Sequence, residues 1–599
     1  MSVALRIEGL TVAYRVAGGE RRVVVSGVDL ELQEGTVVGL AGESGCGKST
    51  LALAATGYRA PGAEILAGRS LLGDLDLVSL PERDLRKVWG ARISFVAQNA
   101  LGALNPGTTI ERQFKQTLRA HSQARGAAVR TRSLELLEAV GIPEPDAALG
   151  RYSHQFSGGQ QQRIAIALSL ASDPSVLILD EPTTGLDVTT QARITAMLSG
   201  LLADSGVAAL YVSHDLALLS TIADRMVVMY GGQVVEQAAC DEALQRPRHP
   251  YTRALLQAAP DVEGRRQLLG IPGRPPLSVQ EGRCAFADRC TMAVDACTAQ
   301  SIGLESVGSD HLVRCIRVAE PALATPPRTL TAKRREGEQG APLLTAEGLV
   351  CSYHRNREPV VRDVSLHVEA GEILGIVGES GSGKTTLLRA LSGVIAPTEG
   401  AIRLDGTELA GLARQRRPEQ RRDLQLVFQN PMSSLNPLHT AADTLRRPIR
   451  LFRPDVSRGE ERETIVELLE SVNLAPEIAD RRPSALSGGQ LQRLSIARAL
   501  AARPRLILCD EVTSALDLSV QAIIVELLRD LVTRTGVSIL FVSHDLGVVR
   551  ALCDRTVVMR DGVVRETAET EQLFTDPGDP YTSELLAAMP ALPQAEVTA

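Results

Sequence analysis

The chain has 599 residues, more than one hydrophobic core normally holds, because domains divide beyond roughly 250–300 residues. Hydrophobic residues at 44% and charged residues at 23% are usual for a globular protein, and no apolar run reaches the ~20 residues of a membrane-spanning helix. The net charge of −7 gives no general attraction to phosphate backbones, which argues against nucleic acid as the main partner.

The N-terminal sequence has no basic stretch followed by an apolar core, so we expect no signal peptide and a cytosolic location. Short apolar runs then alternate with longer helical patterns through the chain. Such runs predict strands of a mostly parallel sheet that helices cover on both faces. We therefore expect α/β domains whose ligand site lies at the carboxyl ends of the strands.

The first motif is a glycine-rich loop between a predicted strand and a predicted helix, GESGCGKST at 42–50. It recurs as GESGSGKTT at 378–386, and later motifs recur in the same order, so the chain is an internal duplication. The glycines let backbone N–H groups surround phosphate oxygens, the lysine reaches the β- and γ-phosphates, and the hydroxyl binds Mg²⁺. The predicted phosphate-binding residues are Gly42, Gly45, Gly47, Lys48, Ser49 and Thr50, and Gly378, Gly381, Gly383, Lys384, Thr385 and Thr386.

Two further apolar strands in each half end in polar residues. In chain order these ends are Asp180-Glu181, His214, Asp510-Glu511 and His544. The carboxyl ends of parallel strands meet at one edge of a sheet, so these side chains should lie beside the P-loops. The aspartates are expected to hold Mg²⁺, and the glutamates and histidines to position and polarise an attacking water. The predicted catalytic residues are Glu181, His214, Glu511 and His544.

A Ser-Gly-Gly-Gln sequence opens a predicted helix in each half, at 157–160 and 487–490. With the P-loops and the acidic strand ends, it resembles the LSGGQ signature of ABC ATPases, although the first copy reads FSGGQ. The resemblance implies two nucleotide-binding domains, each a RecA-like core with a helical subdomain, arranged head to tail. Each ATP would lie between the P-loop of one half and the signature of the other. The implied signature residues are Ser157, Gly159, Gln160, Ser487, Gly489 and Gln490.

The same resemblance assigns further residues of the two ATP sites. The glutamines that contact the metal or the attacking water correspond to Gln98 and Gln429. The aromatic residue that stacks on adenine corresponds to Tyr14 and Tyr353, each a few residues after a short strand. The implied magnesium ligands are Ser49, Gln98, Asp180, Thr385, Gln429 and Asp510. Every expected group is present in both halves, which implies two hydrolytic sites.

An extra segment follows the first half. We expect nucleotide-binding domains at 1–255 and 343–592, a cysteine-rich segment at 256–322, and a linker at 323–342 that loses apolar periodicity. The four cysteines of the segment lack the tight C-x2-C spacing of most zinc sites, so the spacing alone leaves metal binding and free thiols equally open. These cysteines are Cys284, Cys290, Cys297 and Cys315.

Three features resemble the ATPases of oligopeptide and dipeptide (Opp/Dpp-type) importers. They are the QNALGALNP and QNPMSSLNP continuations after the two glutamines, the Pro-Tyr-Thr segments at 249–260 and 579–590, and the GRCAFADRC tail. Some members of that family bind a [4Fe–4S] cluster at such a tail. The resemblance therefore favours a [4Fe–4S] cluster on the four thiolates, with zinc second and unliganded thiols third.

The resemblance implies an ATPase that powers peptide uptake, with one copy per transporter because both nucleotide-binding domains share a chain. Its partners would be two membrane permease subunits, received by residues of about 99–115 and 430–446, and an extracytoplasmic peptide-binding protein. The chain would be peripheral, at the cytoplasmic face of the membrane. Nickel, glutathione or opine cargo stays open. The alternative is a soluble twin-ABC ATPase acting on ribosomes or DNA, against which the short linker and the mid-chain cysteines argue.

Overall fold

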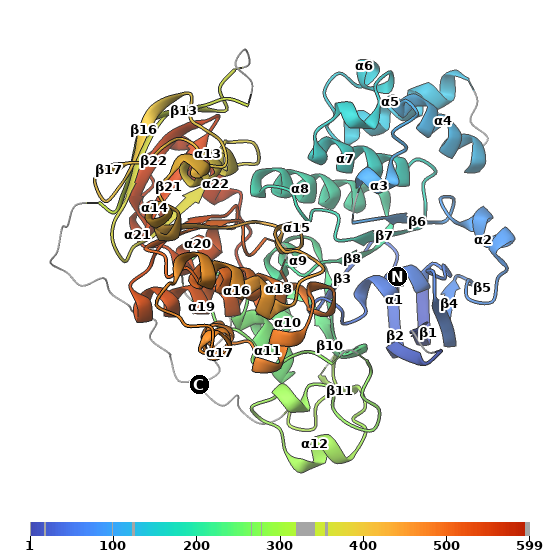
Figure 1. Cartoon of the computed structure of the whole chain (residues 1–599). Coiled ribbons are helices and arrows are strands. Elements are labelled where there is room, and N and C mark those ends of the chain that lie inside the picture. The colour runs from blue at the N-terminus through green and yellow to red at the C-terminus, as the bar shows by residue number, and fades with distance from the viewer. Residues whose placement is uncertain are drawn as a thin grey trace.

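The protein consists of two α/β halves that lie against each other, blue to green and yellow to red in Figure 1. This computed structural model describes residues 2–16, 19–98, 100–121, 126–264, 266, 268–276, 278–308, 310–318, 342–353, 358–514 and 516–593. Of the expected linker at 323–342, only the last residue is among them. The cysteine-rich segment lies at the base of the view, beside the first half (Figure 1).

An antiparallel sheet opens each half. The strand orders are β2-β1-β4-β5 and β14-β13-β16-β17. Alternate residues along β13 and β14 are buried, as expected when one face of a sheet covers the core. The strands are β1 (Val3–Arg15), β2 (Arg21–Gln33), β4 (Ala63–Leu72), β5 (Leu75–Asp76), β13 (Leu344–Cys351), β14 (Val361–Val368), β16 (Glu399–Leu404) and β17 (Thr407–Glu408).

A second, mostly parallel sheet forms the centre of each half. In the first half its order is β11-β12-β10-β9-β3-β8-β7-β6, and β3, β7 and β8 are buried at every position. Continuous burial explains their unbroken apolar sequences, because helices cover both faces. The strands are β3 (Val37–Ala41), β6 (Ile93–Val96), β7 (Val176–Asp180), β8 (Ala208–Val212), β9 (Arg225–Tyr230), β10 (Gln233–Ala239), β11 (Glu305–Gly308) and β12 (His311–Val313).

The second half repeats this sheet in the order β18-β19-β20-β15-β21-β22, without a counterpart of β11 and β12 among the described residues. Its three central strands are again buried throughout. The repetition confirms that the chain contains two α/β cassettes in tandem. The strands are β15 (Ile373–Val377), β18 (Leu424–Val427), β19 (Leu506–Asp510), β20 (Ser538–Val542), β21 (Arg555–Arg560) and β22 (Val563–Glu569).

Helices cover the central sheets, and a group of helices inserted between β6 and β7 forms a separate lobe at the upper right of Figure 1. The helices of the first half are α1 (Lys48–Ala55), α2 (Glu82–Val88), α3 (Ala100–Ala103), α4 (Ile110–His121), α5 (Ala127–Ala139), α6 (Pro145–Leu149), α7 (Gly158–Ser169), α8 (Val188–Ser205), α9 (Leu216–Ile222), α10 (Cys240–Gln245) and α11 (Pro250–Gln257). The inserted helices α3 to α7 correspond to the helical subdomain that the resemblance implied.

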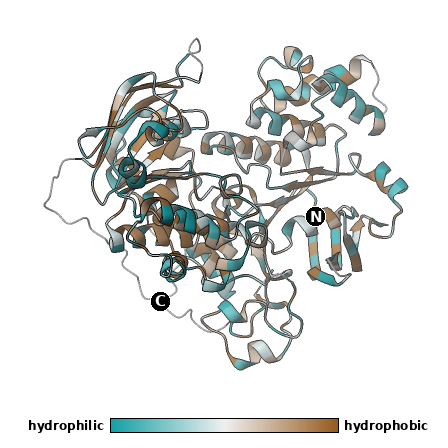
Figure 2. Ribbon diagram, in the orientation of Figure 1, coloured by the Kyte–Doolittle hydropathy of each residue, from teal (hydrophilic) through white to brown (hydrophobic). Residues whose placement is uncertain are grey.

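The same pattern of helices recurs in the second half, where α15 to α18 are inserted between β18 and β19. The helices are α13 (Lys384–Ser392), α14 (Pro418–Asp423), α15 (Pro431–Ser434), α16 (Ala441–Phe452), α17 (Glu461–Ser471), α18 (Gly488–Leu500), α19 (Leu518–Thr535), α20 (Leu546–Leu552), α21 (Thr570–Thr575) and α22 (Pro580–Ala587). Figure 2 shows many hydrophobic residues along the central strands and helices of both halves. No described helix combines the length and apolarity needed to cross a bilayer.

The cysteine-rich segment contacts both halves. It contains the 3-10 turn η2 (Ala287–Arg289) and α12 (Asp295–Ala299), and its hairpin β11–β12 extends the first sheet by pairing with β10. The buried ring of His311 in this hairpin lies 2.8 Å from a carboxylate oxygen of Glu236 and 3.1 Å from one of Glu242. On the other side, the Gly270 N–H donates to the Glu526 carboxylate on α19 at 3.0 Å. The segment therefore joins the first sheet to the second half.

Candidate functional site

The two glycine-rich loops form phosphate cradles between β3 and α1 and between β15 and α13. Gly42 and Gly378 have φ of 146° and 148°, and a Cβ there would lie 2.3 and 2.1 Å from backbone oxygens of the neighbouring strand. Only glycine fits such a position, because a side chain has neither the space nor the backbone angle. The close packing brings the loop backbone over the carboxyl ends of the strands, where phosphate groups bind at a helix N-terminus.

The lysine of each loop is buried and directed into the loop itself. The Lys48 Nζ donates to the backbone oxygens of Gly42 and Glu43 at 2.7 and 3.1 Å. The equivalent lysine of the second half makes the same two bonds, at 2.8 Å each. The Ser49 hydroxyl donates to the Asp180 carboxylate at 3.0 Å, and the second half repeats this bond at the same length. Both loops therefore carry a cation and a hydroxyl–carboxylate pair suited to a polyphosphate and Mg²⁺.

Beside each cradle, a glutamate, a glutamine and a histidine meet. One Glu181 carboxylate oxygen accepts from the Gln98 amide at 2.9 Å, and the other lies 3.3 Å from Nδ1 of His214. In the second half one Glu511 oxygen lies close to both partners, 2.8 Å from the amide of Gln429 and 3.6 Å from Nδ1 of His544. The backbone of Glu181 has φ of 47° and that of Glu511 has φ of 44°, a strained conformation that costs roughly 1–3 kcal/mol. Strain at both equivalent positions indicates a functional constraint.

The electrostatics of these groups favour ionised glutamates. Burial raises the pKa of Glu181, but the hydrogen bond and charge of His214 outweigh it and lower that pKa to about 2. Burial lowers the pKa of His214, whereas its bond to Glu181 raises it above the usual value. The pKa of Glu511 is lowered for the same reasons. Burial, by contrast, raises the pKa of Asp180, and the hydrogen bond from Ser49 and the charge of Lys48 do not outweigh it.

The signature sequences form helix caps. Ser157 caps α7, where its hydroxyl accepts from the Gln160 N–H at 3.3 Å and the Gln160 side chain accepts from the Ser157 N–H at 3.0 Å. Ser487 and Gln490 cap α18 in the same way. These caps explain why serine and glutamine flank the two glycines, since both groups satisfy free N–H groups of the first turn.

Each P-loop pocket is lined partly by the opposite half, but not by its signature. The first cavity, of about 400 Å³, is bounded by Lys48 and Ser49 and by Ser514, Leu516 and Asp517 of the second half. The second cavity, of about 460 Å³, includes residues 184–187 of the first half. The four expected signature contacts, Ser157, Gly159, Ser487 and Gly489, are absent from both linings. Each P-loop pocket thus includes residues that follow the acidic strand end of the opposite half.

The two tyrosines expected at adenine lie at the cradles. The hydroxyl of Tyr353, which is 50% exposed, lies 3.0 Å from that of Thr386. The hydroxyl of Tyr14 lies 3.5 Å from that of Thr50. Tyr14 is inside β1, not after a short strand as the sequence suggested, because β1 continues through bulges to Arg15. An exposed ring beside the last residue of the P-loop is suited to stacking on a base.

Sequence reasoning missed the residues behind the cradles. The Glu43 N–H donates to the buried Tyr251 hydroxyl at 2.9 Å, and the Glu379 N–H donates to the Tyr581 hydroxyl at 3.3 Å. The sequence did contain a signal for these two tyrosines, because both belong to the repeated Pro-Tyr-Thr sequence. Each opens a helix, α11 or α22, whose packing brings the hydroxyl under a P-loop. The repeated sequence thus has a direct physical connection to the nucleotide site.

The four cysteines of the extra segment converge on one small pocket. Cys284, Cys290, Cys297 and Cys315 all line it, with Phe286 among the other residues, and its volume is about 10 Å³. This is space for about one water molecule. Burial raises the pKa of the Cys290 thiol to about 11, which favours the protonated form. No group of histidine, cysteine or acidic side chains among the described residues is arranged to hold a metal ion, so this arrangement does not fit an iron–sulfur cluster.

Comparison with known proteins agrees with this geometry. A family model described as ABC transporter matches residues 25–184 and 361–514. The chain belongs to the ABC transporter family. A second model, described as the C-terminal region of the oligopeptide/dipeptide transporter, matches residues 235–297 and 565–598 of this ABC protein. Because ABC cassettes are ATPases, this ABC protein is an ATP-hydrolysing enzyme.

Relatives of this ABC protein match it along almost the whole chain. The oligopeptide transport ATP-binding protein OppD of Mycobacterium tuberculosis is 38% identical over 98% of this chain and 99% of its own. The peptidoglycan transport ATP-binding protein YejF of Agrobacterium fabrum is 38% identical over 98% and 96%. The glutathione import ATP-binding protein GsiA of Salmonella typhimurium is 35% identical over 98% and 89%. The solved bacterial cassette MJ0796 aligns with 38% of this chain and 98% of its own at 33% identity and a TM-score of 0.35.

Proposed function

We propose that the two halves bind two MgATP between them, hydrolyse both, and thereby drive the uptake of peptides through a membrane permease. The observation that carries this proposal is the composition of the two P-loop pockets, each of which includes residues of the opposite half. An ATP in either pocket would touch both halves. Its binding would therefore stabilise a closed arrangement, because a ligand favours the conformation in which it makes more contacts.

The proposed chemistry assigns a task to each group of the first site. Lys48 would exchange its bonds to loop carbonyls for bonds to the β- and γ-phosphates. Mg²⁺, when bound, would supply charge neutralisation at the phosphates, with Ser49, Gln98 and Asp180 as the residues that hold it. Glu181 would orient the attacking water, and His214 would donate a hydrogen bond to the γ-phosphate. Their equivalents in the second half would act in the same way.

The signatures would enter the sites only when the halves close. Ser157 and Ser487 stand at the N-termini of α7 and α18, whose free N–H groups suit an anion. In the present arrangement neither residue lines either of the two P-loop pockets. We infer a cycle in which ATP draws each signature onto the opposite γ-phosphate and hydrolysis releases it. In this proposal the units that move are the two domains expected at 1–255 and 343–592.

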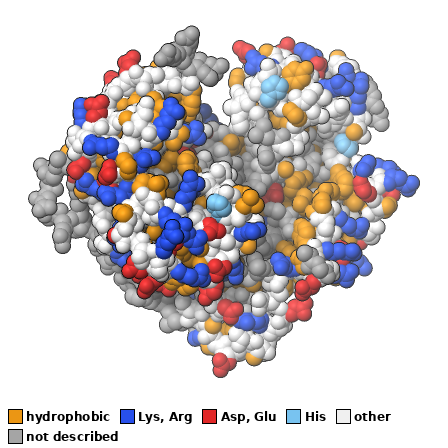
Figure 3. Space-filling model, viewed as in Figure 1, with side chains coloured by type: hydrophobic (Ala, Val, Ile, Leu, Met, Phe, Trp, Pro, Cys, Tyr) orange, Lys and Arg blue, Asp and Glu red, His pale blue; other side chains and the backbone are white. Residues whose placement is uncertain are grey.

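The permease would dock beside the glutamines. In the first half a cavity of about 600 Å³ is lined by Tyr58, Trp89, Leu104 and Gln113, and it overlaps the expected range 99–115. Hydrophobic side chains gather on this visible face of the first half (Figure 3). In the second half, Met432 and Leu438 are 47% and 74% exposed within the expected range 430–446. Exposed apolar residues of this kind mark interaction sites.

The peptide cargo is proposed from the relatives, whose names state oligopeptide, peptidoglycan or glutathione transport. The proposal places one copy of the chain on the cytoplasmic face of the membrane, with two permease subunits and an extracytoplasmic peptide-binding protein. The test is co-expression with genes for candidate permease subunits, followed by copurification and uptake of labelled peptides into vesicles. ATP-dependent uptake of a peptide supports the proposal. A complex with ribosomes or DNA and no permease association would refute it.

The cofactor of the cysteine-rich segment, 256–322, stays a prediction. The resemblance predicts a [4Fe–4S] cluster, with zinc as the alternative; the four thiols converge on one pocket, but no group of side chains among the described residues is arranged to hold a metal ion. No step of the proposed ATP hydrolysis uses these thiols. Metal analysis of protein purified without oxygen decides the matter. About four iron atoms per chain support the cluster, about one zinc supports the alternative, and neither metal makes both wrong.

A further inference from the structure

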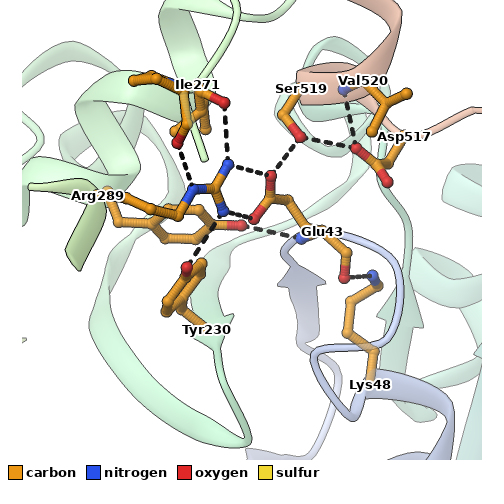
Figure 4. A network of polar contacts seen from close by, with 10 residues as sticks. Glu43, Lys48, Tyr230, Ile271, Arg289, Asp517, Ser519 and Val520 are labelled. Carbon is orange, nitrogen blue, oxygen red and sulfur yellow. Dashed lines mark hydrogen bonds and ion pairs between the residues drawn. The ribbon is translucent and has the colours of Figure 1, made fainter. Parts of the chain in front are cut away.

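The second residue of the first P-loop, Glu43, is a buried charge whose carboxylate is directed toward Arg289 and Ser519 (Figure 4). Its carboxylate accepts hydrogen bonds from Arg289 at 2.6 and 3.1 Å and another from the Ser519 hydroxyl. Arg289 belongs to the cysteine-rich segment, and Ser519 lies in the first turn of α19 in the second half. Three parts of the chain that are distant in sequence therefore meet at one carboxylate.

The Arg289 guanidinium has no spare donor. Besides its bonds to Glu43, it donates to the backbone oxygens of Ile271 and Pro272 and to the Tyr230 hydroxyl, at 3.1, 2.8 and 3.1 Å. These five bonds use all five N–H groups that a guanidinium carries. The side chains of Arg289 and Glu43 are only 3% and 1% exposed. Removal of the arginine would leave a buried, unpaired carboxylate, which is strongly unfavourable.

This carboxylate is connected to the nucleotide pocket through the backbone of its own residue. The Glu43 carbonyl accepts from the Lys48 ammonium at 3.1 Å (Figure 4), and the Glu43 N–H is held by Tyr251. The hydroxyl of Ser519 also lies 2.8 Å from a carboxylate oxygen of Asp517, which lines the first pocket. A shift of Glu43 would therefore displace both the phosphate-binding loop and the wall that the second half contributes.

The second P-loop has no such arginine. Its equivalent glutamate, Glu379, accepts from the Thr189 hydroxyl at 2.6 Å, and Thr189 occupies the position that corresponds to Ser519. The contact between the halves is thus symmetric. In the described part of the chain, however, the Glu379 carboxylate has no ion-pair partner of the kind that Arg289 provides for Glu43. Within the described residues, the cysteine-rich segment thus supplies a cation to Glu43 of the first P-loop and not to Glu379.

The position of Arg289 depends on the fold of that segment. Arg289 ends the 3-10 turn η2, and Cys290 follows it directly. The Cys290 N–H donates to Ala287 in the same turn at 3.3 Å, and the Cys284 N–H donates to the Cys297 carbonyl at 2.8 Å. Arg289 therefore lies at the end of η2, next to Cys290, in a segment where a backbone bond also joins two of the cysteines.

We propose that Arg289 is a positioning residue for the first nucleotide site, through which the cysteine-rich segment controls nucleotide affinity at that site and not at the second. The inference rests on the proposed two-site cycle. The two ATP sites would then differ in nucleotide affinity, although each has the same set of predicted nucleotide-binding residues. Arg289 touches neither phosphate nor water and acts only by fixing Glu43 and its contact with the second half.

The test measures nucleotide affinity at one site at a time in the full chain. Lys384→Ala leaves the first site as the binding site for a fluorescent ATP analogue, and Lys48→Ala leaves the second. In the first background, Arg289→Gln is expected to weaken binding about tenfold, as for loss of a charge-assisted hydrogen bond. In the second background the dissociation constant should stay within about twofold. Arg289→Lys keeps the positive charge but not the planar guanidinium with its five donors, so it should recover part of the lost affinity.

Two further variants separate positioning from general destabilisation. Adding Glu43→Gln to Arg289→Gln removes the unpaired charge, so the combined variant should bind more tightly than Arg289→Gln alone. Arg283→Gln is the matched control, because this arginine of the same segment pairs with Asp288 instead of the loop. Equal weakening at both sites, no weakening at the first, or the same effect from Arg283→Gln would overturn the proposal. If either background binds no nucleotide while Arg289 is intact, the two-site function fails instead.

Discussion

Replacing Glu181 and Glu511 together by glutamine should abolish most ATP turnover without disturbing the fold. Each carboxylate accepts a hydrogen bond from a glutamine side chain, at 2.9 and 2.8 Å, and an amide oxygen can keep that bond. What the change removes is a negative charge beside His214 or its counterpart. Because the pKa of Glu181 is held at about 2, this charge is fully present at neutral pH in the wild-type chain.

The expected loss follows from the task of the carboxylate. A positioned group that accepts a proton or orients water contributes about 10²–10⁴ to the rate, which corresponds to about 3–5 kcal/mol of activation free energy. The double variant should therefore lose at least about a hundredfold in phosphate release. Either single variant keeps about half of the turnover if the sites act independently, and much less if they act as a unit.

The assay is steady-state phosphate release by the purified chain, with binding of a fluorescent ATP analogue measured in parallel. Nucleotide binding should survive in the double variant, since the P-loops are unchanged. Glu82→Gln is the control, because this glutamate is 68% exposed and pairs only with a neighbouring arginine on α2. Turnover within about tenfold of wild type in the double variant would refute the assigned roles.

Three further predictions each concern the contacts of a single residue. Tyr251→Phe removes the acceptor of the Glu43 N–H and should cost about 1–3 kcal/mol, seen as weaker ATP-analogue binding. Gly489→Ala places a Cβ 2.5 Å from the Val520 side chain in the first turn of α19, so it should lower the thermal unfolding midpoint. Gly488→Ala, whose Cβ would lie 4.0 Å from its nearest neighbour, should leave that midpoint unchanged. Burial lowers the pKa of His311, but bonds to two glutamates outweigh it and raise that pKa above 6.5. Its stabilisation is complete below that value and is lost as pH rises through the raised pKa, so proteolysis at 305–313 should accelerate at alkaline pH in wild type but not in His311→Gln.

Much of the nucleotide chemistry could be predicted from local patterns. The P-loops, the acidic strand ends and the histidines each follow a short buried strand, and parallel strands place their carboxyl ends together. The pairing of Gln98 with Glu181 needed the fold, because their hydrogen bond joins residues 83 positions apart. The placement of Tyr14 after a strand was wrong, because bulges let β1 pass a glycine and continue to Arg15. A bulge depends on pairing with neighbouring strands and leaves little trace in one sequence.

The sequence by itself determined that this protein is a duplicated P-loop ATPase, and it predicted the nucleotide-binding groups of each half. Such motifs are readable because their residues lie within a few positions of one another and share one turn or one strand end. Only the tertiary structure decided that the first P-loop is bound to the cysteine-rich segment and to the second half. Glu43 meets Arg289 across 246 positions and Ser519 across 476. A buried carboxylate requires partners, but which distant residues supply them depends on how the finished surfaces pack.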